Sequence, residues 1–506
     1  MISTVVRQLG ELDVPTKTHP RPGPAEGCKR RHFTYLKGRH ATTPPRSPDA
    51  RGVGVAECIV SELVRKTTVR SPRKYSFWCE LPKSGQYLPV RERRALARAE
   101  LLMADAPVIL LEGPRAVGKS TLLREVARLR GGEIIDLDDP AIQEAVRADP
   151  ARANTGQGLV CVDEYQKALI ILEAIKAELN KGADPGRFVL TGSTRQDALP
   201  PAAQALTERL TTLAVYPPPQ GEQAGVREDF LEVALREPGA VVTQARSGTT
   251  VEEYIGRICR GGFPLALGAT TDTAQRRWLR DYVTLTLERD VLELSNLRQG
   301  DKLSDLLGRL AGQNAQVLNI DKAAEAVKLH PVTAESYVSL LEKVFLLYRL
   351  RSWGKTLIAR TVAKPKLHVL DSGVAAMLLR LTPEKLATLD ATASSEFGHL
   401  VETFAVGELR KQASWLDGIA GLGHWRTYEG AEVDHVIERE DGGILGIEIK
   451  KGGRVSSEDL RGLQALRDAV GDRFVGGFAL YLGERSYTYE DRIHVVPLDR
   501  LWAPVS

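Results

Sequence analysis

The sequence is poor in cysteine and has no long apolar run. Five cysteines are scattered over 506 residues, without a C-x-x-C pair or a histidine partner at zinc spacing, which excludes a disulfide scaffold or a zinc module. No run approaches 18 apolar residues, and residues 1–10 lack the apolar core of a signal peptide. We therefore expect a protein of the reducing cytoplasm that neither enters a membrane nor is secreted.

Acidic residues are scarce only at the start of the chain. Residues 1–95 hold 19 Lys+Arg against 8 Asp+Glu, so the remaining chain is net acidic although the whole carries +4. Residues 1–88 mix prolines with basic clusters and keep no apolar period, which predicts a basic, mostly disordered tail. Three interpretations of the tail stay open: a nucleic-acid contact, a solvated arm, and sequence upstream of the native start codon.

A phosphate-binding loop follows the tail. Residues 108–111 are four aliphatic residues typical of a buried strand, and a G-x-x-x-x-G-K-S motif comes directly after them, before a helical pattern. The glycines allow backbone N–H groups to surround phosphates, Lys119 would contact the β- and γ-phosphates, and Ser120 would bind Mg²⁺. The residues expected around ATP are Gly113, Pro114, Arg115, Ala116, Val117, Gly118, Lys119, Ser120 and Thr121.

Two later strand ends complete a nucleoside triphosphatase pattern. Residues 159–162 are apolar and are followed by Asp163, which would hold Mg²⁺, and by Glu164, which would polarise the attacking water. This carboxylate pair favours hydrolysis over a small-molecule kinase, which shields its phosphate from water. Thr191 and Ser193, at the end of a strand at 187–190, either sense the γ-phosphate or form an ordinary turn.

The runs GPRAVGKSTLL, VDEYQKA and RFVLTGSTR resemble those of uncharacterised prokaryotic AAA-type ATP-binding proteins that carry a C-terminal domain of unknown function. The resemblance extends from about residue 96 to the end of the chain. It implies an α/β fold with an AAA+-like three-layer P-loop core, and ATP and Mg²⁺ as cofactors. It also points to Arg209 as a family arginine, acting either in cis or as a finger on a neighbouring subunit of a homo-oligomer.

The middle of the chain is predicted to be helical and then to form a winged helix. Helical patterns fill 223–299, and three short helices at 303–310, 320–327 and 332–341 precede strands near 345–352 and 357–370. The module either packs or binds nucleic acid. For binding, phosphate contacts would come from the basic residues of the ribbon, Arg349, Arg351, Lys355, Arg360, Lys364 and Lys366.

The C-terminal part contains a second candidate site. Strands at 433–438 and 444–450, joined by Asp-Gly-Gly, predict a hairpin in which Glu448 and Lys450 share one face with Asp434. This set resembles the PD-(D/E)xK nuclease fold, in which two carboxylates hold Mg²⁺ and the lysine steadies a hydroxide. A third carboxylate is Glu402 by the family pattern or Glu408 by helical spacing, and we favour Glu402.

We therefore predict five segments: a tail (1–88), an AAA-type ATPase core (89–222), a helical connector (223–299), a winged helix (300–375) and a PD-(D/E)xK-like domain (394–506). The leading functional hypothesis is an ATPase that switches or drives a C-terminal module acting on DNA or RNA. The alternative is an ATP-dependent regulatory switch with an inactive nuclease-like domain that acts through protein partners.

Overall fold

A computed structural model describes most of the chain after residue 92. It covers residues 93–151, 158–195, 209–291, 300–354, 363–388 and 391–505, the short pairs 77–78 and 89–90, and residues 197, 206 and 294. The prediction of a disordered tail at 1–88 lies outside the described residues, apart from β1 (Phe77–Trp78), which pairs with β2 (Pro89–Val90). No helix in this described part is long and apolar enough to cross a bilayer.

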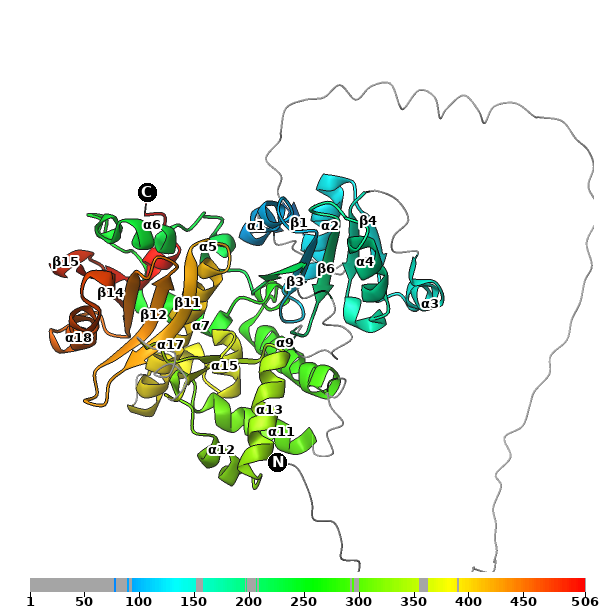
Figure 1. Cartoon of the computed structure of the whole chain (residues 1–506). Coiled ribbons are helices and arrows are strands. Elements are labelled where there is room, and N and C mark those ends of the chain that lie inside the picture. The colour runs from blue at the N-terminus through cyan, green and yellow to red at the C-terminus, as the bar shows by residue number, and fades with distance from the viewer. Residues whose placement is uncertain are drawn as a thin grey trace, which may run out of the picture. The chain divides into compact units, whose positions relative to one another are not determined.

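A five-stranded parallel sheet forms the first α/β unit (Figure 1). Its order along the sheet is β4 (Glu133–Asp136), β5 (Val160–Asp163), β6 (Phe188–Gly192), β3 (Val108–Glu112) and β7 (Leu210–Ala214). Because all five strands run in the same direction, their carboxyl ends meet at one edge. Ligands of such sheets bind at that edge.

Helices cover both faces of this sheet, since its strands are apolar on both sides. Ile109 and Leu111 of β3 pack in one core with α1 (Arg94–Leu102) and α2 (Lys119–Arg130). Leu110 packs in a second core with α4 (Ile171–Leu179). The predicted α/β class with a three-layer core is thus confirmed.

The segment after β7 is helical, as predicted. Its elements are α5 (Gln220–Ala224), α6 (Phe230–Arg236), α7 (Val251–Arg260), α8 (Pro264–Leu267), α9 (Asp272–Leu285) and a π-helix, η6 (Thr286–Val291). A capping box fixes the start of α7, where Thr250 accepts from the Glu253 N–H and Glu253 accepts in return.

Three helices and a two-stranded ribbon follow, in the predicted order. They are α11 (Gly300–Ala311), α12 (Ile320–Ala326), α13 (Pro331–Lys343) and the antiparallel strands β9 (Leu347–Leu350) and β10 (Lys366–Val369), with β8 (Gln316–Val317) beside β10. Two short helices, α15 (Ser372–Leu378) and α16 (Pro383–Ala387), close the segment. Two of the basic ribbon residues named above, Lys355 and Arg360, lie outside the described residues.

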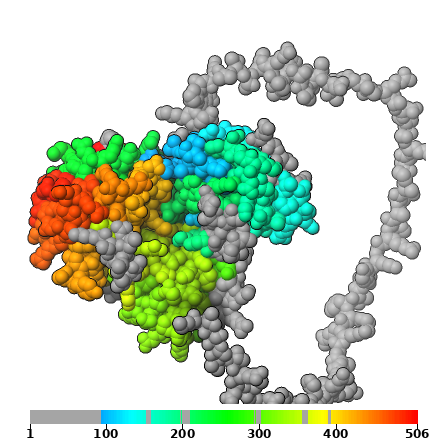
Figure 2. All heavy atoms as spheres, in the orientation of Figure 1, coloured from blue at the N-terminus to red at the C-terminus, as the bar shows by residue number. Residues whose placement is uncertain are grey.

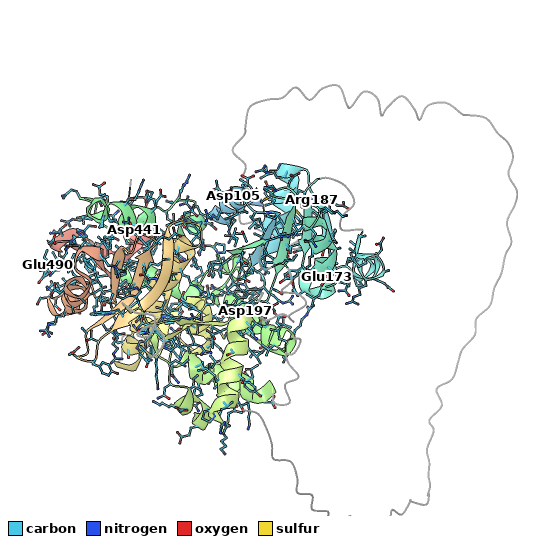
Figure 3. All side chains as sticks on the ribbon, viewed as in Figure 1. Asp105, Glu173, Arg187, Asp197, Asp441 and Glu490 are labelled. Carbon is cyan, nitrogen blue, oxygen red and sulfur yellow. The ribbon has the colours of Figure 1, made fainter. Side chains whose placement is uncertain are left out.

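The C-terminal unit is a six-stranded mixed sheet between helices. Its order is β11 (Ile419–Arg426), β12 (Glu432–Arg439), β13 (Ile444–Lys450), β14 (Phe474–Tyr481), β16 (Ile493–Pro497) and β15 (Tyr487–Glu490). The 23-residue α17 (Ala391–Ala413) packs on one face and α18 (Arg461–Val470) on the other. The predicted hairpin is β12–β13, with Asp441 at its turn (Figure 3).

Helix α6 packs against strand β14 of the C-terminal sheet. Figure 2 shows green atoms from the middle of the chain beside the orange and red atoms of its C-terminal part. Phe230 of α6 meets Phe478 of β14 edge to face, with ring centroids 5.4 Å apart. The Leu231 N–H donates to Gln412 Oε1 of α17 at 2.9 Å. These contacts place the predicted connector in direct packing with the C-terminal part of the chain.

Candidate nucleotide site and carboxylate cluster

The phosphate loop connects β3 to α2 in a conformation that depends on glycine. Gly118 has a φ of 93°, in the left-handed region that glycine adopts without steric cost. At Gly113 a Cβ would stand 2.1 Å from the carbonyl oxygen of Val215, so only glycine fits between the loop and the end of β7. The backbone of 113–118 is therefore free to curve at the carboxyl edge of the sheet, as the motif requires.

Lys119 is held over this loop by backbone carbonyls. Its side chain is buried, and Nζ donates to the oxygens of Gly113 at 2.9 Å and Pro114 at 2.8 Å. Burial lowers the pKa of Lys119 to about 8. Burial has removed water from this ammonium. A negatively charged phosphate that binds beside it would therefore stabilise its charge.

Three predicted residues meet beside the loop. Ser120 Oγ donates to Asp163 Oδ1 at 3.0 Å, and Thr191 Oγ1 donates to the same oxygen. Burial raises the pKa of Asp163, although both hydroxyl donors act against that shift. A hydroxyl and a carboxylate at this separation fit a shared Mg²⁺, which is the pair that P-loop enzymes use for this ion.

Glu164 is fixed by the next strand. Its backbone is left-handed at φ 52°, an unusual conformation for a residue with a side chain, and its N–H donates to Thr191 Oγ1 at 2.9 Å. Ser193 Oγ donates to Glu164 Oε2 at 2.9 Å, and Gln166 Nε2 donates to the same oxygen. The structure therefore brings Glu164, Thr191 and Ser193 together.

Arg209 lies apart from this group. It directly precedes β7, where Leu210 pairs with Val108 at the amino edge of the sheet, a full strand length from the loop. Its Nη1 donates to Asn180 Oδ1 at 3.0 Å on the surface. The geometry does not place Arg209 at the nucleotide site of its own chain, and its action on a neighbouring subunit stays a prediction.

Two ion pairs that the sequence analysis missed reach the loop, although Arg115 itself was expected there. Arg93 Nη1 donates to Val117 O at 2.8 Å, while its Nε forms an ion pair with Glu222 at 2.8 Å. Arg115 Nε bonds to both carboxylate oxygens of Asp290, at 2.7 and 2.6 Å, and Asp290 is only 2% exposed. No local sequence pattern marks either pair, because their members are more than 100 residues apart.

The second predicted site is assembled on the C-terminal hairpin. Asp434 on β12 lies beside β13, where its Oδ2 accepts from the Ile449 N–H at 2.9 Å. Lys450 Nζ donates to Glu448 Oε1 at 2.7 Å. Burial, reinforced by the Asp434 carboxylate, raises the pKa of Glu448 to about 8. The three residues thus share one face, as the alternation predicted.

Of the two candidate carboxylates on α17, Glu402 and Glu408, it is Glu402 that joins this cluster. Glu402 Oε1 and Asp434 Oδ1 lie 2.9 and 2.8 Å from one atom, Lys366 Nζ. Glu408 instead accepts from the Gln220 N–H at 2.8 Å and from Lys411. The preference for Glu402 agrees with this placement.

Lys366 and Arg349, which would contact phosphates if the ribbon bound nucleic acid, instead pair with carboxylates of the chain itself. Lys366 is 3% exposed and faces the carboxylate cluster, and Arg349 bonds to Glu342 and Glu335 of α13. Burial disfavours the Lys366 ammonium, but the surrounding carboxylates outweigh burial and raise its pKa. Strand periodicity alone could not show that this face of β10 is covered by another sheet.

The two sites differ in their fit to a divalent ion. At the loop, Ser120 and Asp163 offer a hydroxyl and a carboxylate beside a phosphate-binding backbone. In the C-terminal cluster an ammonium already stands where Glu402 and Asp434 converge, so Mg²⁺ does not fit there. Within the described ranges no three His, Cys, Asp or Glu side chains are arranged to hold a metal ion.

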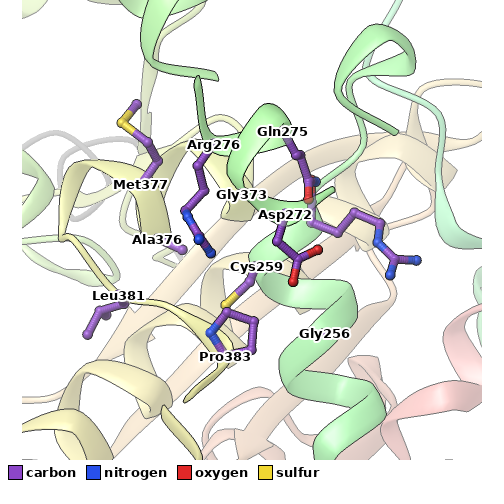
Figure 4. A pocket seen from close by; sticks show the side chains of 11 residues that line it. Gly256, Cys259, Asp272, Gln275, Arg276, Gly373, Ala376, Met377, Leu381 and Pro383 are labelled. Atoms are coloured by element: carbon purple, nitrogen blue, oxygen red, sulfur yellow. The ribbon is translucent and has the colours of Figure 1, made fainter. Parts of the chain in front are cut away.

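A small pocket of about 150 Å³ opens between α7, α9 and the α15–α16 segment (Figure 4). Cys259, Asp272 and Arg276 line it, and none of the loop or cluster residues does. Its volume is below the roughly 300 Å³ of ordinary small-molecule sites, so we assign it no role.

Comparisons with known families divide the chain into three parts. Residues 105–223 match the model of an AAA domain, residues 251–385 a domain of unknown function (DUF8612), and residues 397–501 another domain of unknown function (DUF4143). The chain thus joins a stretch that matches an AAA domain to two later stretches that match domains of unknown function. The winged-helix and nuclease-like interpretations stay predictions.

Two curated relatives are similar over most of the chain. Uncharacterized protein Rv2008c of Mycobacterium tuberculosis and uncharacterized protein Mb2031c of Mycobacterium bovis are each 26% identical over 419 residues, covering 81% of this chain and 85% of the relative. Among solved structures, the Walker-type ATPase paby2304 of Pyrococcus abyssi is 16% identical, with a TM-score of 0.36, over 57% of this chain and 95% of that one. AMPPCP-bound DnaA from Aquifex aeolicus is 12% identical, with a TM-score of 0.21, over 49% of this chain and 85% of that one. The similarity to these two solved structures is too low to support a functional argument.

Proposed function

We propose that the chain hydrolyses ATP at the loop between β3 and α2 and uses its nucleotide state as a switch. The observation that carries the proposal is that polar residues at or after the carboxyl ends of β3, β5 and β6 contact one another. Ser120 and Thr191 both donate to Asp163, and Ser193 holds Glu164 next to them. Such a set of hydroxyls and carboxylates beside a phosphate loop is what Mg²⁺-dependent hydrolysis needs.

Each residue then has a defined task. The loop N–H groups and Lys119 bind the phosphates, and Ser120 and Asp163 would hold Mg²⁺, which supplies charge neutralisation for the phosphate oxygens. Glu164 accepts a proton from the attacking water. The Ser193 and Gln166 contacts keep its carboxylate oriented, so Glu164 need not reorganise when water arrives.

Two variants of the full chain test this proposal. Lys119→Ala should lose ATP binding, whereas Glu164→Gln should bind ATP normally and hydrolyse it at least about 100-fold more slowly. Binding is measured with a fluorescent ATP analogue and hydrolysis by phosphate release. Normal phosphate release by Glu164→Gln would contradict the proposed base. Phosphate that appears on a metabolite instead of in solution would favour the kinase alternative.

We further propose that nucleotide state reaches the rest of the chain through Arg115. Its partner Asp290 lies in the π-helix η6, and such helices often occur at functional sites. Hydrogen exchange of α11, which packs against η6, should therefore change when a non-hydrolysable ATP analogue binds. Identical exchange with and without the analogue would contradict this route.

We consider two possible activities for the C-terminal module. In the first it cuts DNA or RNA, and Mg²⁺-dependent cleavage should then disappear in Asp434→Ala. In the second the nuclease-like domain is inactive and the switch acts on protein partners. The buried Lys366 favours the second candidate, because its ammonium takes up the carboxylates that cleavage would need. Arg209 contributes in either case only across a homo-oligomer interface.

A further inference from the structure

The carboxylate cluster of the C-terminal sheet contains a cation from elsewhere in the same chain. Lys366 Nζ lies 2.9 Å from Glu402 Oε1 and 2.8 Å from Asp434 Oδ1. A third oxygen, Glu432 Oε1, lies 2.7 Å away. Lys366 Nζ donates hydrogen bonds to Glu402 and Asp434 and forms an ion pair with Glu432, so three acidic oxygens surround the ammonium. The lysine side chain is 4% exposed, which excludes water as its main partner.

The backbone holds Lys366 in this place. The segment after β9 is hydrogen-bonded to the edge strand β11, since the Trp353 N–H donates to His424 O at 2.6 Å and the His424 N–H donates to Arg351 O at 3.0 Å. A Cβ at Gly423 would stand 2.8 Å from Arg351 O, so a glycine is needed for this approach. Trp353 Nε1 also donates to Glu438 Oε2 of β12 at 3.1 Å. The ribbon that carries Lys366 is therefore fastened to the sheet that carries the cluster.

This arrangement conflicts with a divalent metal in the cluster. Mg²⁺ needs close oxygen ligands on several sides, and it would share Glu402 and Asp434 with an ammonium already within 3 Å of them. Two like charges so close together repel strongly where water is excluded. Conversely, removing the ammonium would leave buried carboxylates without a counter-charge, which is the condition under which proteins bind divalent ions.

We infer that Lys366 is the resident cation of the cluster formed by Glu402, Glu432 and Asp434, in the position where a nuclease of this type would hold its metal. The cluster then joins the ribbon β9–β10 to the C-terminal sheet and does not prepare a phosphodiester for cleavage. The inference does not depend on ATP hydrolysis, because it concerns none of the loop residues.

The test measures Mn²⁺ binding and thermal stability of the full, nucleotide-free chain. Free Mn²⁺ is counted by electron paramagnetic resonance in the native chain and in Asp434→Asn, Lys366→Met and Lys364→Met. Methionine keeps most of the lysine volume without its charge, and Lys364 is a matched control because it is exposed two residues away. The comparison with Asp434→Asn isolates the cluster from any Mn²⁺ held by Ser120 and Asp163.

Four results are expected. Native chain and Asp434→Asn bind the same amount of Mn²⁺. Lys366→Met melts at a lower temperature than Lys364→Met, binds Mn²⁺ about tenfold or more tightly than the native chain, and regains part of its stability with the ion. If Asp434→Asn binds one Mn²⁺ fewer than the native chain, the inference is overturned. This comparison holds even if Lys366→Met fails to fold. Equal melting of Lys366→Met and Lys364→Met, without extra Mn²⁺, overturns it too.

Discussion

Glu228 is the residue whose substitution gives the clearest stability test of the junction between the ATPase core and the C-terminal part. It is 1% exposed and packs against α5, where a Cβ at Gly221 would meet its Oε2 at 2.1 Å. Burial raises the pKa of Glu228 to about 7, and the neighbouring carboxylates of Glu222 and Glu408 add to the shift. The folded chain therefore binds a proton at Glu228 more tightly than the unfolded chain does.

The sign of the pH effect follows from this difference. Stability from the protonated carboxyl is fully present below the unfolded pKa of 4.5 and is lost as the pH rises toward the folded pKa of about 7. One pKa unit corresponds to about 1.4 kcal/mol, so the loss over this window is roughly 3 kcal/mol. Above pH 7 the cost stays constant, because both states are then ionised.

Glu228→Gln should remove this cost, since the amide resembles the protonated carboxyl in shape and charge. We expect the variant to be more stable than the native chain by roughly 3 kcal/mol at pH 8 and almost equal to it at pH 4.5. Thermal midpoints measured from pH 4.5 to 8 test this, with the exposed Glu237→Gln as control. A variant that is no more stable at pH 8, or whose difference from the native chain does not change with pH, would refute the reasoning.

Three further substitutions test other contacts. Asp290→Asn should lower the thermal midpoint and weaken nucleotide binding by less than about tenfold, because Arg115 loses a charged partner but stays a quarter exposed; unchanged stability would contradict the role of this pair. Gly113→Ala should lose nucleotide binding while circular dichroism shows a folded chain, since the Cβ would collide with Val215 O; retained binding would contradict the loop geometry. Arg209→Ala should leave ATP affinity unchanged in a fluorescence titration, and a loss of about tenfold or more would contradict its place at the amino edge of the sheet.

The parts of the molecule that the sequence predicted are those set by short-range rules. The loop follows an apolar strand directly, Asp163 and Thr191 lie at the ends of two others, and parallel strands bring these ends to one edge. The hairpin likewise follows from alternation on both sides of a turn, which placed Asp434 near Glu448. In these cases the spacing along the chain determines the spacing in space.

The contacts that were not predicted depend on packing between distant segments. Arg115 and Asp290 are 175 residues apart, and Lys366 and Asp434 are 68 apart. A weak signal for Lys366 did exist. It begins the buried strand β10, and a charge among buried positions needs a buried partner. The sequence could not show which partner, because that depends on how the ribbon docks on β11.

The loop is connected to the rest of the chain by two arginines, and this bears on how a switch would work. Arg93 bonds to the loop carbonyl of Val117 and pairs with Glu222 of α5, and the N–H at the start of α5 donates to Glu408 of α17. Arg115 reaches η6 through Asp290. A guanidinium bonds several partners in fixed directions, so a shift of the loop backbone changes the geometry at both ends of each contact. Helix α17 also carries Glu402, which pairs with Lys366. A rearrangement of the loop around ATP would therefore act on the same helix that the Lys366 cluster holds. The lysine would then set how firmly that helix holds the ribbon while the nucleotide changes.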